Sequence, residues 1–142
     1  MPKTPLKVSP LDVLTQEFLA ISIEATPGEE FGAGRIEVER KLVGDNAETD
    51  EWTLYLTVEI SGSDGRASPP YTGHVTARGV YTVHPDYPQD PERLIRITAA
   101  SMLYGAVREL VSSFTARGPN GMITLPSLSF YEKPPKPKKK AG

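Results

Sequence analysis

Cysteine is absent from this chain of 142 residues, and no long apolar run occurs in it. Without cysteine, disulfide bonds and thiolate metal sites are excluded. Because no stretch approaches about 18 apolar residues, we expect no transmembrane helix. The N-terminus, Met-Pro-Lys-Thr-Pro, lacks the apolar region of a secretory signal, so a cytoplasmic protein is the expectation. The length suits one domain with its own hydrophobic core.

Residues that carry catalysis are also scarce, with only two histidines in the chain. His84 with Asp86 and Asp90 is the nearest approach to a metal-ligand set, but turn-forming aspartates in a Pro-rich loop explain this trio equally well. Ser112 and Ser113 have no flanking elbow glycines and no assignable His and Asp partners. We therefore expect no enzymatic activity, no catalytic residue, no metal site and no cofactor.

Charge is distributed unevenly along the chain. The last ten residues contain five lysines and no acid, whereas residues 1–132 hold 11 basic and 18 acidic side chains, a net charge of −7. An acidic body repels phosphate, so a nucleic-acid partner is not expected. The composition predicts one domain over residues 1–132 and a disordered basic Pro/Lys tail over residues 133–142.

Period-two alternation of apolar and polar residues predicts four β-strands. The clearest run places apolar side chains at every second position from Trp52 to Ile60. Turn-rich segments containing Gly, Pro, Ser and Asp separate the runs. The predicted strands cover residues 17–25, 35–43, 52–60 and 71–83, after an irregular lead-in over residues 1–12.

The first and fourth predicted strands carry details that a structure can test. In the first strand, Leu19, Ile21 and Ile23 fall on one face by simple alternation. Phe18 then falls on the other face. In the fourth strand, Gly79 indicates either a β-bulge or a close approach by a neighbouring backbone.

A single long helix is predicted to begin at Pro91. Asp90 suits the N-cap, and proline suits the first helical position. Arg117-Gly118 followed by proline marks the helix end. The helix carries a stripe of large apolar residues, and additional apolar side chains widen it beyond what one sheet covers. The residues of the stripe are Leu103, Val107, Leu110 and Phe114.

The order of elements predicts an α+β domain: a four-stranded antiparallel sheet followed by one long helix. A lone helix on a four-stranded sheet leaves apolar surface uncovered, so we expect the chain to form a dimer or tetramer through the helix and the sheet edges. The glycine within the helix would permit close packing of another backbone. The residues expected at this interface are Met102, Gly105, Ala106 and Glu109.

Four short motifs follow one another in the second half of the chain. They are Ala77-Arg78-Gly79-Val80-Tyr81-Thr82-Val83, Leu103-Tyr104-Gly105-Ala106-Val107-Arg108-Glu109, Arg117-Gly118 and Leu125-Pro126-Ser127-Leu128-Ser129-Phe130. These motifs resemble a strand, a helix, a helix end and the closing segment of the SecB-type protein-export chaperones. The spacing from Arg-Glu through Arg-Gly to the last Phe agrees without a gap. Over residues 17–76 the resemblance is limited to topology.

The resemblance implies a SecB-like domain that acts as an ATP-independent holdase. Proteins of this family assemble as dimers that pair into tetramers, hold unfolded clients in apolar grooves and deliver them to the SecA motor through an acidic sheet surface. Two departures stand out: Gly105-Ala106 replaces a Pro-Tyr pair, and the lid helix that the family carries after its closing segment is missing. The alternative is therefore a SecB-like adaptor dedicated to one partner, as in a toxin–antitoxin, phage or defence complex.

The predicted client contacts are aromatic and aliphatic side chains on the apolar surface made by the helix, the segment that follows it and the nearby sheet, because burial of apolar surface tolerates many client sequences. These residues are Phe31, Trp52, Tyr81, Met122, Ile123 and Leu125. Acidic strand residues are the candidates for docking a SecA-like motor or another partner. These are Glu24, Glu37 and Glu39.

Overall fold

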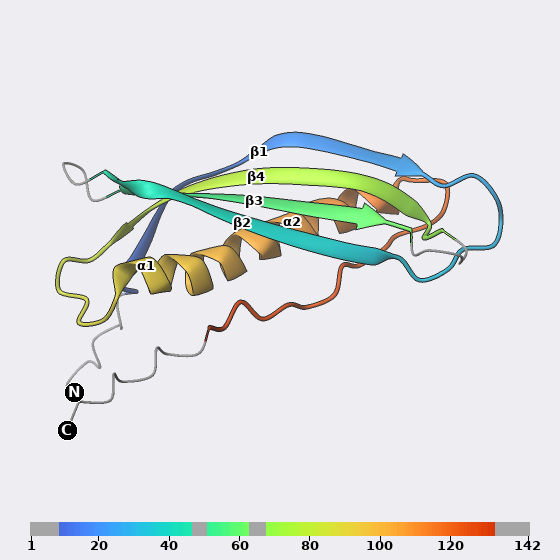
Figure 1. Ribbon diagram of the computed structural model, residues 1–142. Helices are drawn as coiled ribbons and strands as arrows, with labels where there is room; N and C mark the ends of the chain where they lie inside the picture. The colour runs from blue at the N-terminus through green and yellow to red at the C-terminus, as the bar shows by residue number, and fades with distance from the viewer. Residues whose placement is uncertain (1–8, 47–50, 63–67, 133–142) are drawn as a thin grey trace, which may run out of the picture.

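The structure, a computed structural model, describes residues 9–46, 51–62 and 68–132. A four-stranded sheet covers one long helix, and the chain then returns beneath the helix (Figure 1). This arrangement confirms the predicted α+β fold class. The predicted basic tail, residues 133–142, lies outside the described residues. The elements are β1 (Leu11–Ala25), β2 (Arg35–Asn46), β3 (Glu51–Ser61), β4 (Tyr71–Val83), α1 (Pro91–Leu94), the π-helical turn η1 (Ile95–Ala99) and α2 (Ala100–Ala116).

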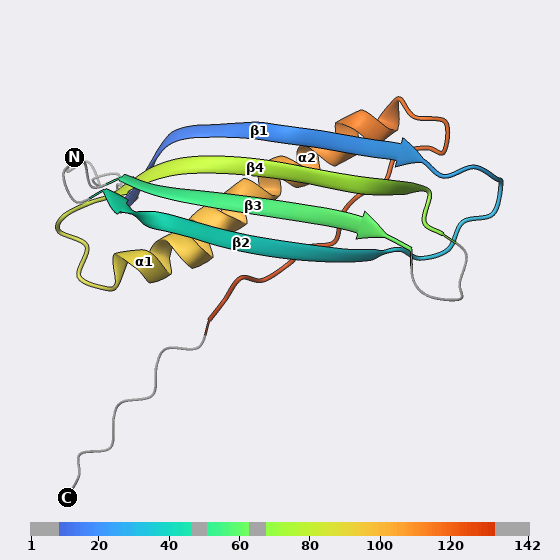
Figure 2. The ribbon, with the colours of Figure 1, turned by 45° about the horizontal axis from the view of Figure 1, so that its top comes forward.

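The sheet is antiparallel throughout, with the strand order β1-β4-β3-β2. Strands β2, β3 and β4 follow one another as neighbours, whereas residues 26–34 carry the chain from β1 at one edge to β2 at the other (Figure 2). The buried side of the sheet faces the helix. It includes the predicted alternating residues of β3, which confirms that period-two run: Leu54, Leu56, Val58 and Ile60 are all buried.

Strand β1 differs most from the prediction. It begins at Leu11, within the segment predicted to be an irregular lead-in. Two register shifts against β4 leave Leu14 and Leu19 as extra residues of the strand. Because each bulge moves the alternation by one residue, Phe18 lies opposite Ala77 and shares the helix-facing side with Ile21. The predicted faces of Phe18 and Leu19 were therefore wrong, whereas Ile21 and Ile23 share a face as predicted.

Gly79 leaves room for a neighbouring side chain. The pairing of β3 with β4 passes through Leu54 and Gly79 without a register shift, so no bulge occurs there. A Cβ atom at Gly79 would instead collide with the phenol of Tyr81. The glycine therefore makes room for a side chain, and neither the bulge nor the close backbone approach that was predicted is found there. Tyr81 is fully buried, accepts a hydrogen bond from Nε2 of Gln16 (3.1 Å), and has its pKa raised by burial.

The helical segment starts and ends as predicted. The Asp90 carboxylate accepts a hydrogen bond from the Glu92 backbone N–H (3.0 Å), and Pro91 is the first helical residue. The helix ends at Ala116, with Arg117 as its C-cap. The π-helical turn was not predicted. In this turn the Arg96 carbonyl accepts a hydrogen bond from Nη1 of Arg40 on β2 (2.6 Å).

The buried stripe of the helix is rotated from the predicted one. Leu103 and Val107 are buried as predicted, but Tyr104 and Val111 complete the core contact with the sheet. Phe114 remains 49% exposed. The rotation places one predicted core residue on an uncovered side of the helix.

A polar corner joins the end of α2 to the loops at one end of the sheet. The buried Tyr71 hydroxyl donates to the Gly121 carbonyl (2.8 Å) and accepts from the Asn120 backbone N–H (3.1 Å). The Asn120 side-chain amide donates to the carbonyls of Thr26 (2.9 Å) and Pro70 (2.8 Å). Three separate segments are therefore fixed to one another at this corner.

Candidate functional site: the two flanks of helix α2

One flank of α2 is apolar and uncovered. It consists of residues spaced four apart, and this spacing places them in one line along a helix. We call Met102, Ala106, Leu110 and Phe114 the open row. Met102 is 43% exposed, and a hollow of about 720 Å³ lies over the end of the row, lined by Leu110, Ser113, Phe114, Ala116, Arg117 and Gly118. Exposed apolar side chains in such a line are typical of a protein-binding surface.

The underside of β1 is a second uncovered apolar surface. The helix packs mainly beneath β3 and β4 and crosses the sheet at an angle (Figure 2), and most residues of β1 are exposed. In the described part of the chain, the outer edge of β1 also has no strand partner. We call the exposed large apolar residues of this strand the β1 strip. They are Val13, Leu14, Phe18, Leu19 and Ile21.

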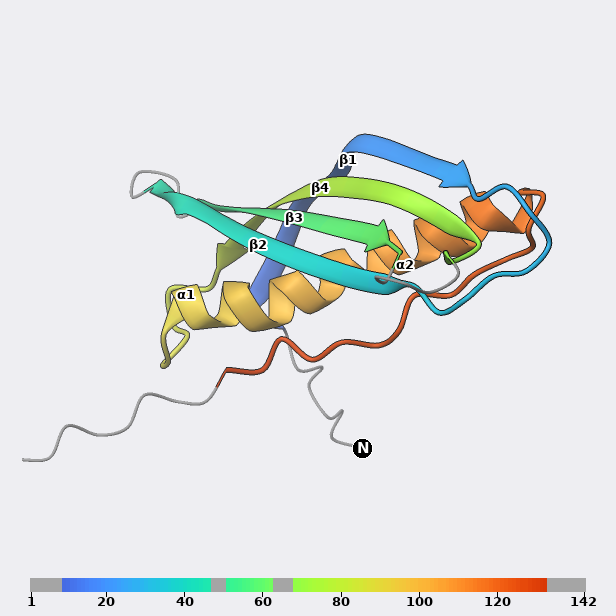
Figure 3. The ribbon, with the colours of Figure 1, turned by 45° about the vertical axis from the view of Figure 1, so that its right-hand side comes forward.

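The other flank of α2 is occupied by the chain itself. Residues 121–132, which we call the return segment, run back along the helix (Figure 3). Three helix side chains spaced four apart donate hydrogen bonds to carbonyl oxygens of this segment, and we call them the donor row. The Tyr104 hydroxyl donates to Pro126 (2.5 Å), Nε of Arg108 to Leu125 (3.0 Å) and the Ser112 hydroxyl to Ile123 (3.1 Å).

Two apolar side chains anchor the return segment. Leu125 and Phe130 are both buried. The Phe130 ring packs edge-on against the Tyr104 ring, with 5.8 Å between the centroids, and the Arg40 guanidinium lies 5.2 Å from the Phe130 centroid. Burial raises the pKa of Tyr104, with Arg108 acting in the opposite direction. Its phenol therefore remains a hydrogen-bond donor at neutral pH.

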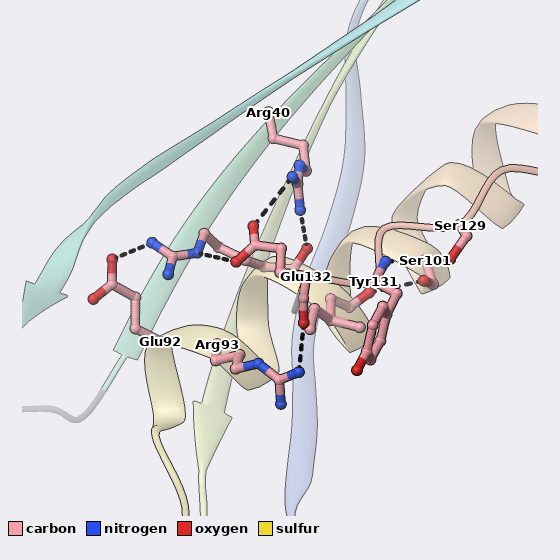
Figure 4. Close-up of polar contacts among 9 residues, drawn as sticks. Arg40, Glu92, Arg93, Ser101, Ser129, Tyr131 and Glu132 are labelled. Carbon is pink, nitrogen blue, oxygen red and sulfur yellow. Dashed lines mark hydrogen bonds and ion pairs between the residues drawn. The ribbon is translucent and has the colours of Figure 1, made fainter. Parts of the chain in front are cut away.

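Arginines hold the last described residue of the return segment. The Glu132 carboxylate pairs with Arg40 (3.2 Å) and Arg96 (3.4 Å). The Glu132 backbone carbonyl accepts from Nη2 of Arg93 (2.6 Å), as Figure 4 shows. We call these four residues the Glu132 latch. It fastens the end of the return segment to both β2 and the start of the helix.

The outer face of the sheet carries a shallow acidic hollow of about 420 Å³. Glu37 and Glu39, both predicted for docking, line it together with Glu59. Glu59 was missed; in the observed β2–β3 pairing it lies directly opposite Glu37. Glu24 lies on β1, at the other edge of the sheet. The structure thus brings two of the three predicted acidic residues together.

The predicted client contacts lie in three separate places. Met122, Ile123 and Leu125 belong to the return segment, and Phe31 belongs to the β1–β2 connection. Trp52 of β3 lies opposite Tyr81 of β4. Met122 is exposed, whereas Leu125 and Tyr81 are buried in this chain by itself. Client binding at these six residues stays a prediction.

The predicted oligomer contacts divide in a similar way. Met102 and Ala106 belong to the open row, together with Leu110 and Phe114, which were not assigned to the interface. Gly105 and Glu109 are exposed on the adjacent side of the helix, and a Cβ atom at Gly105 would have no neighbour within 4 Å. Self-association through these residues stays a prediction.

Neither a membrane-spanning helix nor a metal-ligand group is found in residues 9–46, 51–62 and 68–132. No described helix has the length and apolar character needed to cross a bilayer. No three His, Asp or Glu side chains of these ranges gather in an arrangement suited to a metal ion.

The sequence matches no protein-family model and no curated protein. The fold is similar to that of a solved SecB-like chaperone, Rv1957 of Mycobacterium tuberculosis, in complex with a ChAD peptide from the antitoxin HigA1 (Rv1956). The TM-score is 0.63 at 16% identity, over 84% of this chain and 91% of that one. A protein of unknown function from Streptococcus agalactiae gives a TM-score of 0.46 at 12% identity, over 82% of this chain and 96% of that one. The SecB-like resemblance predicted from the motifs is confirmed at the level of the fold.

Proposed function

We propose that this chain, which has a SecB-like fold, is a protein-binding chaperone that works without ATP and holds unfolded polypeptides in the cytoplasm. The observation that carries the proposal is the apolar surface left uncovered by the domain, namely the open row and the β1 strip. Burial of apolar surface stabilises a complex by about 25 cal/mol per Å². Such surfaces bind other polypeptides with little dependence on sequence.

Part of the uncovered surface serves self-association in this proposal. The free edge of β1 can pair with the same edge of a second copy, and the open row lies on the flank of α2 that is not occupied by the return segment. A symmetric dimer would extend the sheet and cover the open row of each copy. Clients would then bind to the apolar surface that remains, including the exposed Met122 of the return segment.

The acidic hollow on the outer face of the sheet supports a separate docking role. Glu37, Glu39 and Glu59 present three carboxylates on a face that no other described element covers (Figure 2). Arg35 pairs with Glu37 (3.0 Å) at a highly exposed position, which neutralises little of this charge. A basic surface of a SecA-like motor, or of a dedicated partner, would be complementary to the hollow.

The alternative is an adaptor that binds one specific partner. One observation favours it: the structurally similar Rv1957 binds a peptide from an antitoxin. An adaptor would use the same apolar surfaces but would discriminate among partners. It would also require no capacity to protect unrelated proteins from aggregation.

Two experiments separate these functions. A holdase should suppress aggregation of a chemically denatured model protein at a stoichiometric ratio without nucleotide, and unchanged aggregation at a tenfold excess of the chain would reject this function. In a pull-down from cells that express the chain, many unfolded proteins would indicate a holdase. One dominant folded protein would indicate an adaptor.

A further inference from the structure

The return segment is held in place almost entirely by side chains. Among the described residues, no backbone group of residues 122–132 bonds to another backbone group. Its hydrogen bonds instead come from the donor row, from Thr115, whose hydroxyl accepts from the Ile123 N–H (3.0 Å), and from the Glu132 latch. The segment therefore lies in a groove as a bound peptide does, without joining the sheet.

The groove recognises chemical features that another polypeptide can supply. The donor row binds main-chain carbonyl oxygens, which every residue has, so these contacts do not depend on the sequence of the occupant. Side-chain recognition is limited to two buried apolar anchors, Leu125 and Phe130, and to the carboxylate of Glu132. The matching occupant is an extended segment with two large apolar residues five positions apart and an acidic residue two positions after the second.

The outward-facing side chains of the return segment are exposed, so the segment can leave the helix while the domain stays folded. Met122 and Tyr131 are 63% and 64% exposed, and Leu128 is also exposed. The ion pairs of the latch are partly exposed as well, so water can replace them at modest cost. Only Leu125, Phe130 and their neighbours lose buried contacts when the segment leaves, and an incoming peptide restores those contacts.

We propose that the groove between the donor row and β2 is a peptide-binding site that the return segment occupies in the free chain. An extended segment of a partner protein, with the two apolar anchors and the acidic residue, replaces the return segment there. The proposal rests on the proposed function, since it names the segment of a partner that this chain would hold. It adds that the chain's own return segment fills the site until a segment of a partner displaces it.

A synthetic peptide of residues 121–132 is the probe for this exchange. The chain contains no cysteine, so Ser127→Cys gives a unique attachment point for an environment-sensitive fluorophore on the return segment. A tethered segment has an effective concentration in the millimolar range, so the identical free peptide should displace it with an apparent Kd of about 1 mM. Displacement is read as a change in fluorescence.

The decisive measurement compares Glu132→Gln in the chain with the same substitution in the peptide, because the two should change peptide affinity in opposite directions. Glu132→Gln in the chain weakens the internal occupant and should tighten peptide binding about tenfold. The same change in the peptide weakens the incoming occupant and should loosen binding by the same factor. If Glu132→Gln in the chain leaves peptide affinity unchanged or lowers it, the peptide does not exchange with the return segment.

Matched controls complete the experiment. Glu29→Gln removes an equal charge from the β1–β2 connection and should leave peptide affinity unchanged. A peptide with Asp at the positions of Leu125 and Phe130 should not displace the return segment. Displacement by this control peptide, or an absence of displacement by the natural peptide in the Glu132→Gln chain, overturns the proposal.

The outcome is distinguishable from failure of the proposed function. A chain that captures denatured proteins but shows no peptide exchange would retain the chaperone function and lose only this site. A chain that exchanges the peptide but neither suppresses aggregation nor captures any protein would retain the groove and lose the chaperone function.

Discussion

The two flanks of helix α2 carry rows of the same spacing and opposite chemistry. The donor row, Tyr104, Arg108 and Ser112, presents polar hydrogens and is already paired with carbonyls of the return segment. The side chains of the open row present only carbon and sulfur atoms; those of Met102 and Phe114 are exposed, whereas Ala106 and Leu110 are half-buried. One helix therefore offers a directional contact on one side and a non-directional apolar contact on the other.

This difference indicates which contacts are exchangeable and which are permanent. Hydrogen bonds to main-chain carbonyls are lost and remade at little net cost, because water or another peptide can replace the partner. An apolar row of four side chains is stabilised when a partner buries it permanently. Because apolar contacts are not directional, the row does not fix the position of an extended partner along the helix as hydrogen bonds do. We therefore associate the donor row with a replaceable occupant and the open row with a second copy of the chain.

The largest expected effect concerns the anchor of the return segment. Phe130→Ala removes the ring that packs on Tyr104 and Arg40, and it should lower the free energy of unfolding by about 3 kcal/mol. Leu128→Ala, in the same segment but 38% exposed, is the matched control and should cost less than about 1 kcal/mol. Chemical denaturation measures both. Equal losses would mean that the segment is not anchored through Phe130.

The open row gives the next effect. Phe114→Glu places a charge in the surface proposed to bind a second copy, and it should weaken self-association at least about 100-fold, which corresponds to about 2.7 kcal/mol. Ser113→Glu adds the same charge on the neighbouring side chain and should have a smaller effect. Light scattering during size-exclusion chromatography measures the mass. A wild-type chain that is monomeric at all concentrations would contradict the assignment of the open row.

Removal of one donor from the donor row should have a smaller effect. Tyr104→Phe keeps the ring against Phe130 and deletes only the hydroxyl that donates to Pro126. Since Pro126 is exposed, water can satisfy its carbonyl, and the free energy of unfolding should fall by about 1 kcal/mol. Thermal and urea denaturation report the change. A loss as large as that of Phe130→Ala would show that the hydroxyl, and not the ring, holds the segment.

The smallest expected effect is a loss of stability at alkaline pH. Burial raises the pKa of Tyr104 and of Tyr81, so the folded chain retains these phenolic protons more strongly than the unfolded chain. Their contribution is complete below the unfolded pKa of about 10 and is lost as the pH rises through the higher folded pKa. Urea denaturation between about pH 9 and 11 should show this decline. Tyr104→Phe should make the decline of stability with pH less steep. An unchanged dependence on pH would show that other groups cause the decline.

The sequence was sufficient to predict the element order and the helix boundaries. Asp90, Pro91 and Gly118 act locally, so their signals do not depend on the rest of the fold. The faces of β1 were not predictable, because bulges at Leu14 and Leu19 arise from pairing with β4 and leave no reliable local signal.

The candidate site was predicted only in part. Apolar residues of the return segment were recognised as important, but whether such a residue is buried by its own chain or offered to another depends on tertiary packing. Tyr81 and Leu125 show this limit, since both are buried here. The spacing of Tyr104, Arg108 and Ser112 was the available signal for the donor row. It was overlooked because polar residues four apart on a helix usually face solvent.

The polar corner around Tyr71 has a consequence for the time course of folding. Its hydroxyl and the amide of Asn120 connect positions that are 49 and 94 residues apart in the chain. Contacts of this separation form slowly, because a long stretch of chain must be ordered before they yield any stabilisation. Asn120 also follows all four strands and the helix in the sequence, so on the ribosome this corner can close only after these elements have emerged. Until then, the end of the helix and its hollow must remain unfixed in the nascent chain.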